Sequence, residues 1–298
     1  MAVNGIDVSH WQGSVDFTKV KAAGYSFVIL NAGYGKFDNQ KDERFEENYK
    51  KAKAAGLGVG AYWYSYALSS DDAKKEAECF LRAIKGKQFD YPVAFDIEDR
   101  TQESLSSATI GQICTAFCDK VTSAGYYVSL YSYVSFLENR IPAAVRSKYD
   151  IWVANFDVQK PSYSGAYGMW QHTSTARVPG VTGNCDCNYA YKDYPAIIKA
   201  KGLNGYPKPA PKPASKTALD TEGMKQGDKN LGVYELKSFL SILEKCGYIS
   251  QHVTVDNGFG SGTTTIVNSL LKKWGYKENG IAGKNFIDKV TAIISNKL

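Results

Sequence analysis

Helical segments that stop at a glycine alternate with short apolar runs through roughly the first two hundred residues of the chain. Three such stops are Ala22-Ala23-Gly24, Ala54-Ala55-Gly56 and Ser123-Ala124-Gly125. Glycine after a helix end can take the left-handed conformation of a C-cap, and the runs that follow are rich in β-branched and aromatic residues. The pattern predicts strands at residues 25–30, 57–66 and 126–133, and further apolar runs predict strands at 6–10, 91–98, 150–156 and 167–173.

Strands that alternate with helices indicate an α/β fold with a parallel sheet. About eight strands in about 195 residues favour a closed (β/α) barrel of TIM-like type. Helical patterns become sparse after residue 145, so we expect the last part of the barrel to be irregular and strand-rich.

Alternating prolines interrupt this pattern at residues 207–216. Proline continues neither a helix nor a central strand, and such a stretch is semi-rigid and extended. We therefore expect a barrel domain at 1–202, a Pro/Lys-rich linker at 203–216 and a second domain at 217–298.

Three amphipathic stripes follow the linker, at residues 233–243, 266–274 and 286–294. The joints between them share an acid-Asn-Gly-apolar pattern, beginning at Asp256 and again at Glu278. This predicts a small all-α three-helix domain with a weak internal repeat. It contains no acid pair, Cys/His cluster or phosphate loop, so a binding module is expected.

Composition and charge exclude several classes of function. A net charge of +6 without a dense basic block does not indicate a nucleic-acid partner. No apolar window is long enough for a membrane helix, and the N-terminus has no Sec-type pattern, so we expect synthesis in the cytoplasm without a signal peptide.

Among the six cysteines, Cys114 and Cys118 lie on an apolar stripe and are expected to be core thiols. No metal site or cofactor is expected.

Two carboxylates stand at the end of the run Val93-Ala94-Phe95, which leads directly into Asp96-Ile97-Glu98. In a strand, Asp96 and Glu98 share one face. The carboxyl end of a barrel strand is where barrel enzymes hold their catalytic groups. Two acids at such a place suit glycoside hydrolysis, which uses a protonated carboxyl beside an ionised one.

The chain resembles glycoside hydrolase family 25, the lysozymes that cut the β-1,4 bond between N-acetylmuramic acid and N-acetylglucosamine, over about residues 4–195. The resemblance rests on five ordered motifs: Ile6-Asp7-Val8-Ser9-His10-Trp11-Gln12-Gly13, Asp42-Glu43-Arg44-Phe45-Glu46-Glu47-Asn48, Gly58-Val59-Gly60-Ala61-Tyr62-Trp63, Phe95-Asp96-Ile97-Glu98, and Trp170-Gln171 with the closing segment 178–188. The chain departs from the family pattern at Trp63, His172, Cys185 and Cys187. These departures concern contacts with the sugars.

The second domain resembles three-helix peptidoglycan-binding domains, on Asp256-Asn257-Gly258-Phe259-Gly260 and Glu278-Asn279-Gly280-Ile281. A barrel, a linker and a wall-binding domain together are similar to a phage endolysin. This arrangement implies bacterial peptidoglycan as the partner and action on the cell wall after release through a separate membrane pore.

The resemblance implies Glu98 as the general acid, with Asp96 beside it. It also places Asp7 and Asp186 at the ends of the first and last strands, where they would flank the central pair. The spacing of Asp96 and Glu98 leaves retaining and inverting mechanisms open. A D-x-E strand end and the 2-acetamido groups of both wall sugars favour retention with substrate assistance.

Aromatic residues near strand ends are candidates for stacking on sugar rings, and we expect Tyr62, Tyr131 and Trp170 to do so. Two other functions remain open: a carbohydrate-binding protein with an inactive barrel, and a hydrolase of another N-acetylated glycan.

Met224 lies between the linker and the first stripe of the second domain. Translation that starts there gives a free 75-residue wall-binding domain, residues 224–298, which can associate with the same domain of a full-length chain. An ordinary methionine at this position is the alternative.

Overall fold

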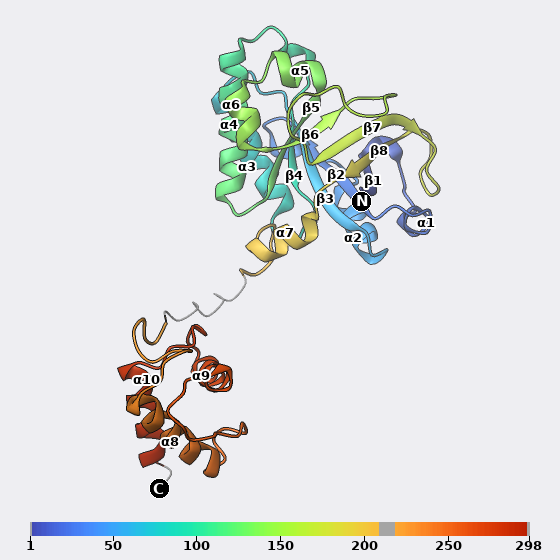
Figure 1. Cartoon of the computed structure of the whole chain (residues 1–298). Helices are drawn as coiled ribbons and strands as arrows, with labels where there is room; N and C mark the ends of the chain where they lie inside the picture. Colours follow the sequence, from blue (N-terminus) through green and yellow to red (C-terminus); the bar gives the residue numbers. More distant parts are fainter. Residues whose placement is uncertain (1, 209–217, 297–298) are drawn as a thin grey trace. The chain divides into compact units, whose positions relative to one another are not determined.

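The computed structural model describes residues 2–208 and 218–296. The chain divides into two compact units, residues 1–209 and 210–298, and each is described by itself (Figure 1). No helix in the described part of the chain is both long and apolar enough to span a membrane.

Eight strands close into a barrel in the order in which they occur along the chain. They are β1 (Val3–Val8), β2 (Phe27–Tyr34), β3 (Gly58–Tyr64), β4 (Val93–Asp96), β5 (Val128–Tyr133), β6 (Asp150–Ala154), β7 (Met169–Ala176) and β8 (Cys185–Ala190). The strands from β1 to β7 pair in parallel, whereas β8 is antiparallel to both β7 and β1. The expected closed barrel with an irregular last part is confirmed in outline, and β8 is a strand that the apolar pattern did not predict.

Helices cover the outside of the barrel (Figure 1). They are α1 (Phe17–Ala22), α2 (Phe45–Ala54), α3 (Ser70–Ile84), α4 (Ser107–Ser123), α5 (Val134–Asn139), α6 (Ala143–Lys148) and α7 (Tyr194–Lys201), with short 3-10 turns η1 (His10–Gln12), η2 (Asp38–Gln40) and η3 (Arg100–Gln102). The three predicted glycine stops follow α1, α2 and α4, and all three have positive φ: Gly24 at 91°, Gly56 at 72° and Gly125 at 90°.

Side chains on β4 alternate between the helices and the barrel interior. Phe95 is fully buried and stacks on Phe117 of α4, with ring centroids 4.1 Å apart. Asp96 points to the opposite side. Cys114 and Cys118 are buried on the same helix as Phe117, as the apolar stripe predicts.

The first residues of the expected linker are attached to the barrel. Asn204 is fully buried, accepts a hydrogen bond from Tyr127 N (2.7 Å) and donates one to Tyr91 O (2.9 Å). Most of the proline-rich stretch, residues 209–217, lies outside the described residues.

The second unit contains α8 (Leu231–Lys245), α9 (Ser261–Lys273) and α10 (Lys284–Ser295). Each helix packs the apolar residues of one predicted stripe into or against a shared core, which includes Leu240, Val267, Leu271, Phe286 and Val290. Asp220 accepts hydrogen bonds from the backbone N–H groups of Gly283, Asn285 and Phe286 at the start of α10 (2.9–3.2 Å). The chain before α8 therefore helps to hold the third helix.

Candidate active site

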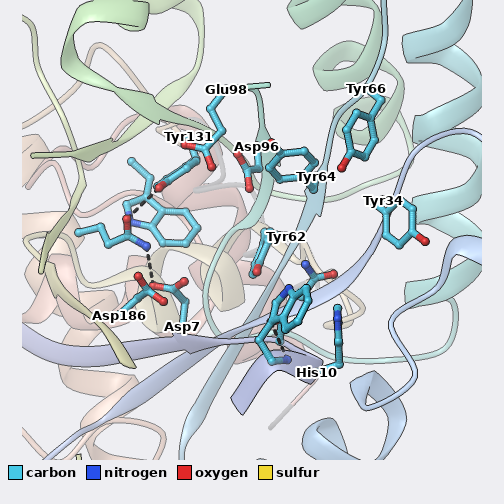
Figure 2. Close-up of a pocket in the computed structure, with 15 residues that line it drawn as sticks. Asp7, His10, Tyr34, Tyr62, Tyr64, Tyr66, Asp96, Glu98, Tyr131 and Asp186 are labelled. Atoms are coloured by element: carbon cyan, nitrogen blue, oxygen red, sulfur yellow. Dashed lines mark hydrogen bonds between the residues drawn. The ribbon is translucent and has the colours of Figure 1, made fainter. Parts of the chain in front are cut away.

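Four carboxylates meet in one cavity of about 550 Å³ in the barrel (Figure 2). Asp7, Asp96, Glu98 and Asp186, the four acids expected to form the site, all line it. The other lining residues are Ser9, His10, Trp11, Asn31, Tyr34, Tyr62, Tyr64, Tyr66, Tyr131, Trp152 and Gln171.

The carboxyl ends of β1 and β4 carry Asp7 and Asp96 to this cavity. Glu98 lies two residues further on, after β4 has ended. Asp186 was expected to end the last strand, but it is the second residue of β8. Because β8 is antiparallel, its beginning lies beside the carboxyl end of β1, and Asp7 and Asp186 are register partners.

Burial dominates the acid–base properties of this cluster. It raises the pKa of Glu98 to about 7, and the charges of Asp7 and Asp99 add to the rise. Burial also raises the pKa of Asp186 to about 8, with further contributions from Asp7 and Glu98. The pKa of Asp96 lies well above its usual value for the same first reason, followed by the charges of Glu98 and Asp7. Protons are therefore available in this site near neutral pH.

A buried oxygen of Asp96 has no protein partner. Among the described residues, its Oδ1 and the Oδ1 of Asn31 are buried acceptors that receive no hydrogen bond. Both residues line the cavity. A buried acceptor of this kind is costly unless a bound molecule supplies a donor.

Asp7 is held by side chains that sequence reasoning did not single out. Its Oδ2 accepts hydrogen bonds from Gln171 Nε2 (2.9 Å) and Asn188 Nδ2 (2.7 Å). Burial raises the pKa of Asp7 to about 6, and these two hydrogen bonds oppose the rise. Asn188 lies two residues after Asp186 and shares its face of β8.

The three expected sugar platforms occupy different places. Tyr62 and Tyr131 line the cavity, but Tyr131 is only 7% exposed and donates its hydroxyl hydrogen bond to Gln171 Oε1 (2.8 Å). Trp170 is 5% exposed, donates its indole N–H to Asn155 O (2.8 Å) and does not line the cavity.

Exposed aromatic side chains line the cavity instead on the side away from Asp186 (Figure 2). Tyr34 is 41% exposed and meets Tyr66, 47% exposed, edge to face at 6.0 Å. Trp11 is 82% exposed, and its ring centroid lies 4.7 Å from that of His10. His10 is anchored through its backbone N and Nδ1 to Asp42 Oδ2 (3.0 and 2.8 Å). Trp11 was not among the expected sugar platforms, because its exposure depends on the turn after β1 and not on alternation along a strand.

No group of three or more His, Cys, Asp or Glu side chains in residues 2–208 and 218–296 is arranged to hold a metal ion. His172 does not line the cavity and stacks on Tyr189 at 4.2 Å. The side chains that line the cavity carry carboxyl, amide, hydroxyl and aromatic groups, the imidazole of His10 among them.

Comparison with known proteins agrees with this geometry. The family model described as "Glycosyl hydrolases family 25" matches residues 6–181. An autolytic lysozyme of Clostridium acetobutylicum is 32% identical over 184 residues, which are 62% of this chain and 54% of that protein. Lysozyme M1 of Streptomyces globisporus is 32% identical over 202 residues, covering 62% of this chain and 67% of that protein.

Among solved structures, the CTP1L endolysin superposes with a TM-score of 0.60 at 28% identity and covers 67% of this chain and 70% of its own. The chain spans about half the length of the Clostridium relative, and both curated matches cover 62% of this chain. The family model covers more than half of the chain, including Asp7, Asp96 and Glu98. The chain belongs to family 25 of the glycosyl hydrolases.

Proposed function

We propose that the protein is a peptidoglycan hydrolase, an N-acetylmuramidase of the endolysin type that cleaves the β-1,4 bond between N-acetylmuramic acid and N-acetylglucosamine. The observation that carries the proposal is a partly buried Glu98 with a pKa raised to about 7, beside three further carboxyls in one cavity. Two curated relatives are lysozymes by name, which supports the wall glycan as substrate.

Glu98 is the general acid in this proposal. Its raised pKa leaves a large fraction of the carboxyl protonated near neutral pH, so it can protonate the glycosidic oxygen as the bond from that oxygen to C1 breaks. The aglycone leaves with this proton, and Glu98 remains as a carboxylate. Positive charge then develops at C1 and on the ring oxygen.

Asp96 orients the 2-acetamido group of the sugar. The acetamido N–H supplies the donor that the buried Oδ1 of Asp96 lacks, and this hydrogen bond favours the ionised form of Asp96 as positive charge develops. The acetamido oxygen attacks C1 from the face opposite the leaving oxygen and forms a cyclic oxazolinium. Glu98 then takes a proton from water as that water attacks C1, which restores the acid and retains the configuration.

Asp7 places negative charge beside this pair, whereas burial favours the neutral form of Asp186. Asp7 raises the pKa of Glu98, Asp96 and Asp186. The role of Asp7 in the proposal is to keep the proton on Glu98 and to stabilise positive charge at C1, and Asp186 lies opposite it as a group that binds sugar or water. Tyr62 contacts the sugar at the centre of the cavity.

The second unit is proposed to bind the cell wall. Residues 217–298 form its domain, joined to the barrel domain at 1–202 through the proline-rich segment. The protein then acts on the wall after release from the cell that makes it.

Analysis of the sugar ends in digested walls tests the proposal. Purified walls are digested and reduced with borohydride, and the new reduced ends are identified. New muramic acid ends support a muramidase. New glucosamine ends exclude it, new ends on chitin but not on walls point to another N-acetylated glycan, and binding without new ends points to an inactive barrel. Proton NMR of the first-formed anomer separates retention from inversion.

We also propose Met224 as a second start of translation. The CTP1L endolysin is described as regulated by a secondary translation product. In this chain Met224 forms a two-way backbone pair with Ala282, so a product that begins there keeps its contact with the segment before α10. Intact-mass analysis of wild type beside Met224→Leu tests this. A short species that begins at Met224 and disappears in the variant supports the start, and one that persists indicates proteolysis.

A further inference from the structure

Two side chains donate hydrogen bonds to the same oxygen of Asp7, which Figure 2 labels among the cavity residues. Gln171 and Asn188 both donate to Oδ2, and these three side chains are each at most 5% exposed. No residue within the described part of the chain donates to Oδ1. The two oxygens of this carboxylate therefore have different surroundings.

A second hydrogen bond, to the oxygen of each amide, fixes the orientation of that amide. The indole N–H of Trp152 donates to Asn188 Oδ1 (2.8 Å), and the hydroxyl of Tyr131 donates to Gln171 Oε1 (2.8 Å). An indole N–H can only donate, so the oxygen of Asn188 must face Trp152 and its NH₂ must face Asp7. A hydroxyl can donate or accept, so Gln171 is held less strictly than Asn188.

This arrangement restricts where Asp7 can carry a proton. An amide NH₂ has no lone pair to accept a hydrogen bond, so two such groups on Oδ2 leave that oxygen no place for a proton. A proton on Asp7 must lie on Oδ1, and both donors favour the ionised carboxylate. They act against burial, and the pKa of Asp7 at about 6 is lower than that of Glu98 or Asp186.

We propose that Gln171 and Asn188 are positioning residues. Their hydrogen bonds make Asp7 the carboxylate that is ionised among the four acids, so that Glu98 retains its proton. The ordinary alternative is that the two amides only satisfy buried polar groups of the barrel. That role affects stability, but it does not decide which carboxyl carries the charge. The effect on Glu98 in catalysis rests on the proposed function, whereas the charge on Asp7 does not.

The first test is the pH profile of kcat/KM for Asn188→Leu in the full chain, with soluble glycan strands from walls as substrate. Loss of one hydrogen bond to a charged group should lower the maximal value of kcat/KM about 10- to 100-fold. The acidic limb moves up by about one to two pH units, because Asp7 ionises later. The basic limb moves down, because a neutral Asp7 no longer holds the proton on Glu98.

Two further variants complete this test. Tyr131→Phe keeps the ring, removes the donor behind Gln171, and moves both limbs in the same directions by a smaller amount. Asn155→Ala removes an amide that accepts from Ser162 outside the cavity, and it leaves both limbs in place. A uniform loss of kcat with unmoved limbs in Asn188→Leu and Tyr131→Phe assigns the two amides a structural role and overturns the proposal.

The second test needs no activity. The Asp carboxyl carbons are labelled with ¹³C in the full chain, and the Asp7 signal is identified by its loss in Asp7→Asn. Asp7 titrates at the lowest pH among the cavity aspartates of the wild type, and its titration moves up in Asn188→Leu and in Tyr131→Phe. If Asn188→Leu does not fold, Tyr131→Phe decides. An Asp7 titration that matches wild type in the folded variants overturns the proposal even where wall cleavage is absent.

Discussion

Asp7 of β1 and Asp186 of β8 lie directly opposite each other at the seam that closes the barrel. Two carboxylates in register on neighbouring strands repel when both are ionised. Burial already disfavours the charge on Asp186, and Asp7 adds to this effect. The barrel therefore bears a pH-dependent cost at the position where its first and last strands meet.

Asp186→Asn should remove that cost. The pKa of Asp186 is about 8 in the fold against an ordinary 3.8, so the cost is absent below pH 4 and grows as pH rises to about 8. Because this side chain is partly exposed, we expect the variant to gain about 2 to 4 kcal/mol in free energy of unfolding at pH 8 and little at pH 4. Urea unfolding at both pH values measures this, and an equal effect at both would contradict the prediction.

Glu98→Gln should abolish most wall cleavage and leave the fold intact. The amide keeps the shape of the side chain but has no acidic proton, so the rate should fall at least about 10²-fold. In the wild type, activity should decline above about pH 7, where Glu98 loses its proton. Turbidity loss of purified walls measures both effects.

Glu103→Gln is the matched control for this experiment. Glu103 is exposed, accepts a hydrogen bond from Tyr133 (3.3 Å) and lies outside the cavity. Its substitution should leave lysis at the wild-type rate. Near-normal lysis by Glu98→Gln would show that another group is the acid.

Trp11→Ala tests the exposed aromatic side of the cavity. If a sugar ring stacks on this indole, its loss should cost about 0.5–1.5 kcal/mol of binding, a rise in KM of about 2- to 13-fold, with kcat little changed. Stability should be unaffected, because the side chain is 82% exposed. Phe37→Ala is the control, since Phe37 is 60% exposed and does not line the cavity. An unchanged KM in Trp11→Ala would remove the indole from the sugar site.

Residues 217–298 should fold alone and bind walls without cutting them. A fragment that begins at Met224 keeps α8, α9 and α10 but lacks Asp220, which caps α10 with three hydrogen bonds. It should therefore be less stable by about 0.5–2 kcal/mol. Asp220→Ala in the longer fragment should reproduce the loss, as thermal unfolding can measure. Sedimentation with walls tests binding, and a fragment that stays in the supernatant would exclude the wall-binding role.

Local sequence patterns were sufficient for most of the barrel but not for its last strand. Gly24, Gly56 and Gly125 marked helix ends because a positive φ is a local requirement. Cys185–Ala190 alternates small polar and thiol side chains and lacks a β-branched run, so no local signal marks β8. Its antiparallel direction depends on contacts with β1 and β7, which are distant in the sequence.

The sequence predicted which residues form the site more successfully than it predicted how deeply their side chains are buried. Alternation along a strand shows which side chains share a face, and it brought Asp96 and Glu98 together. It does not show how deep a ring lies, and Trp170 and Tyr131 are buried by neighbours from other strands. Gln171 and Asn188 were missed because neutral amides carry no charge pattern, although their contacts with Asp7 are among the most specific in the cavity.

The antiparallel seam also has a consequence during synthesis. β1 is the first strand to leave the ribosome, and its partner β8 ends only at Ala190. At about 5–20 residues per second, β1 waits roughly 10–40 s for that partner. During this interval one edge of β1 has unpaired backbone groups that another chain can bind. A nascent barrel thus keeps an edge open to aggregation until its last strand is made, and a product that stops short of residue 185 keeps that edge.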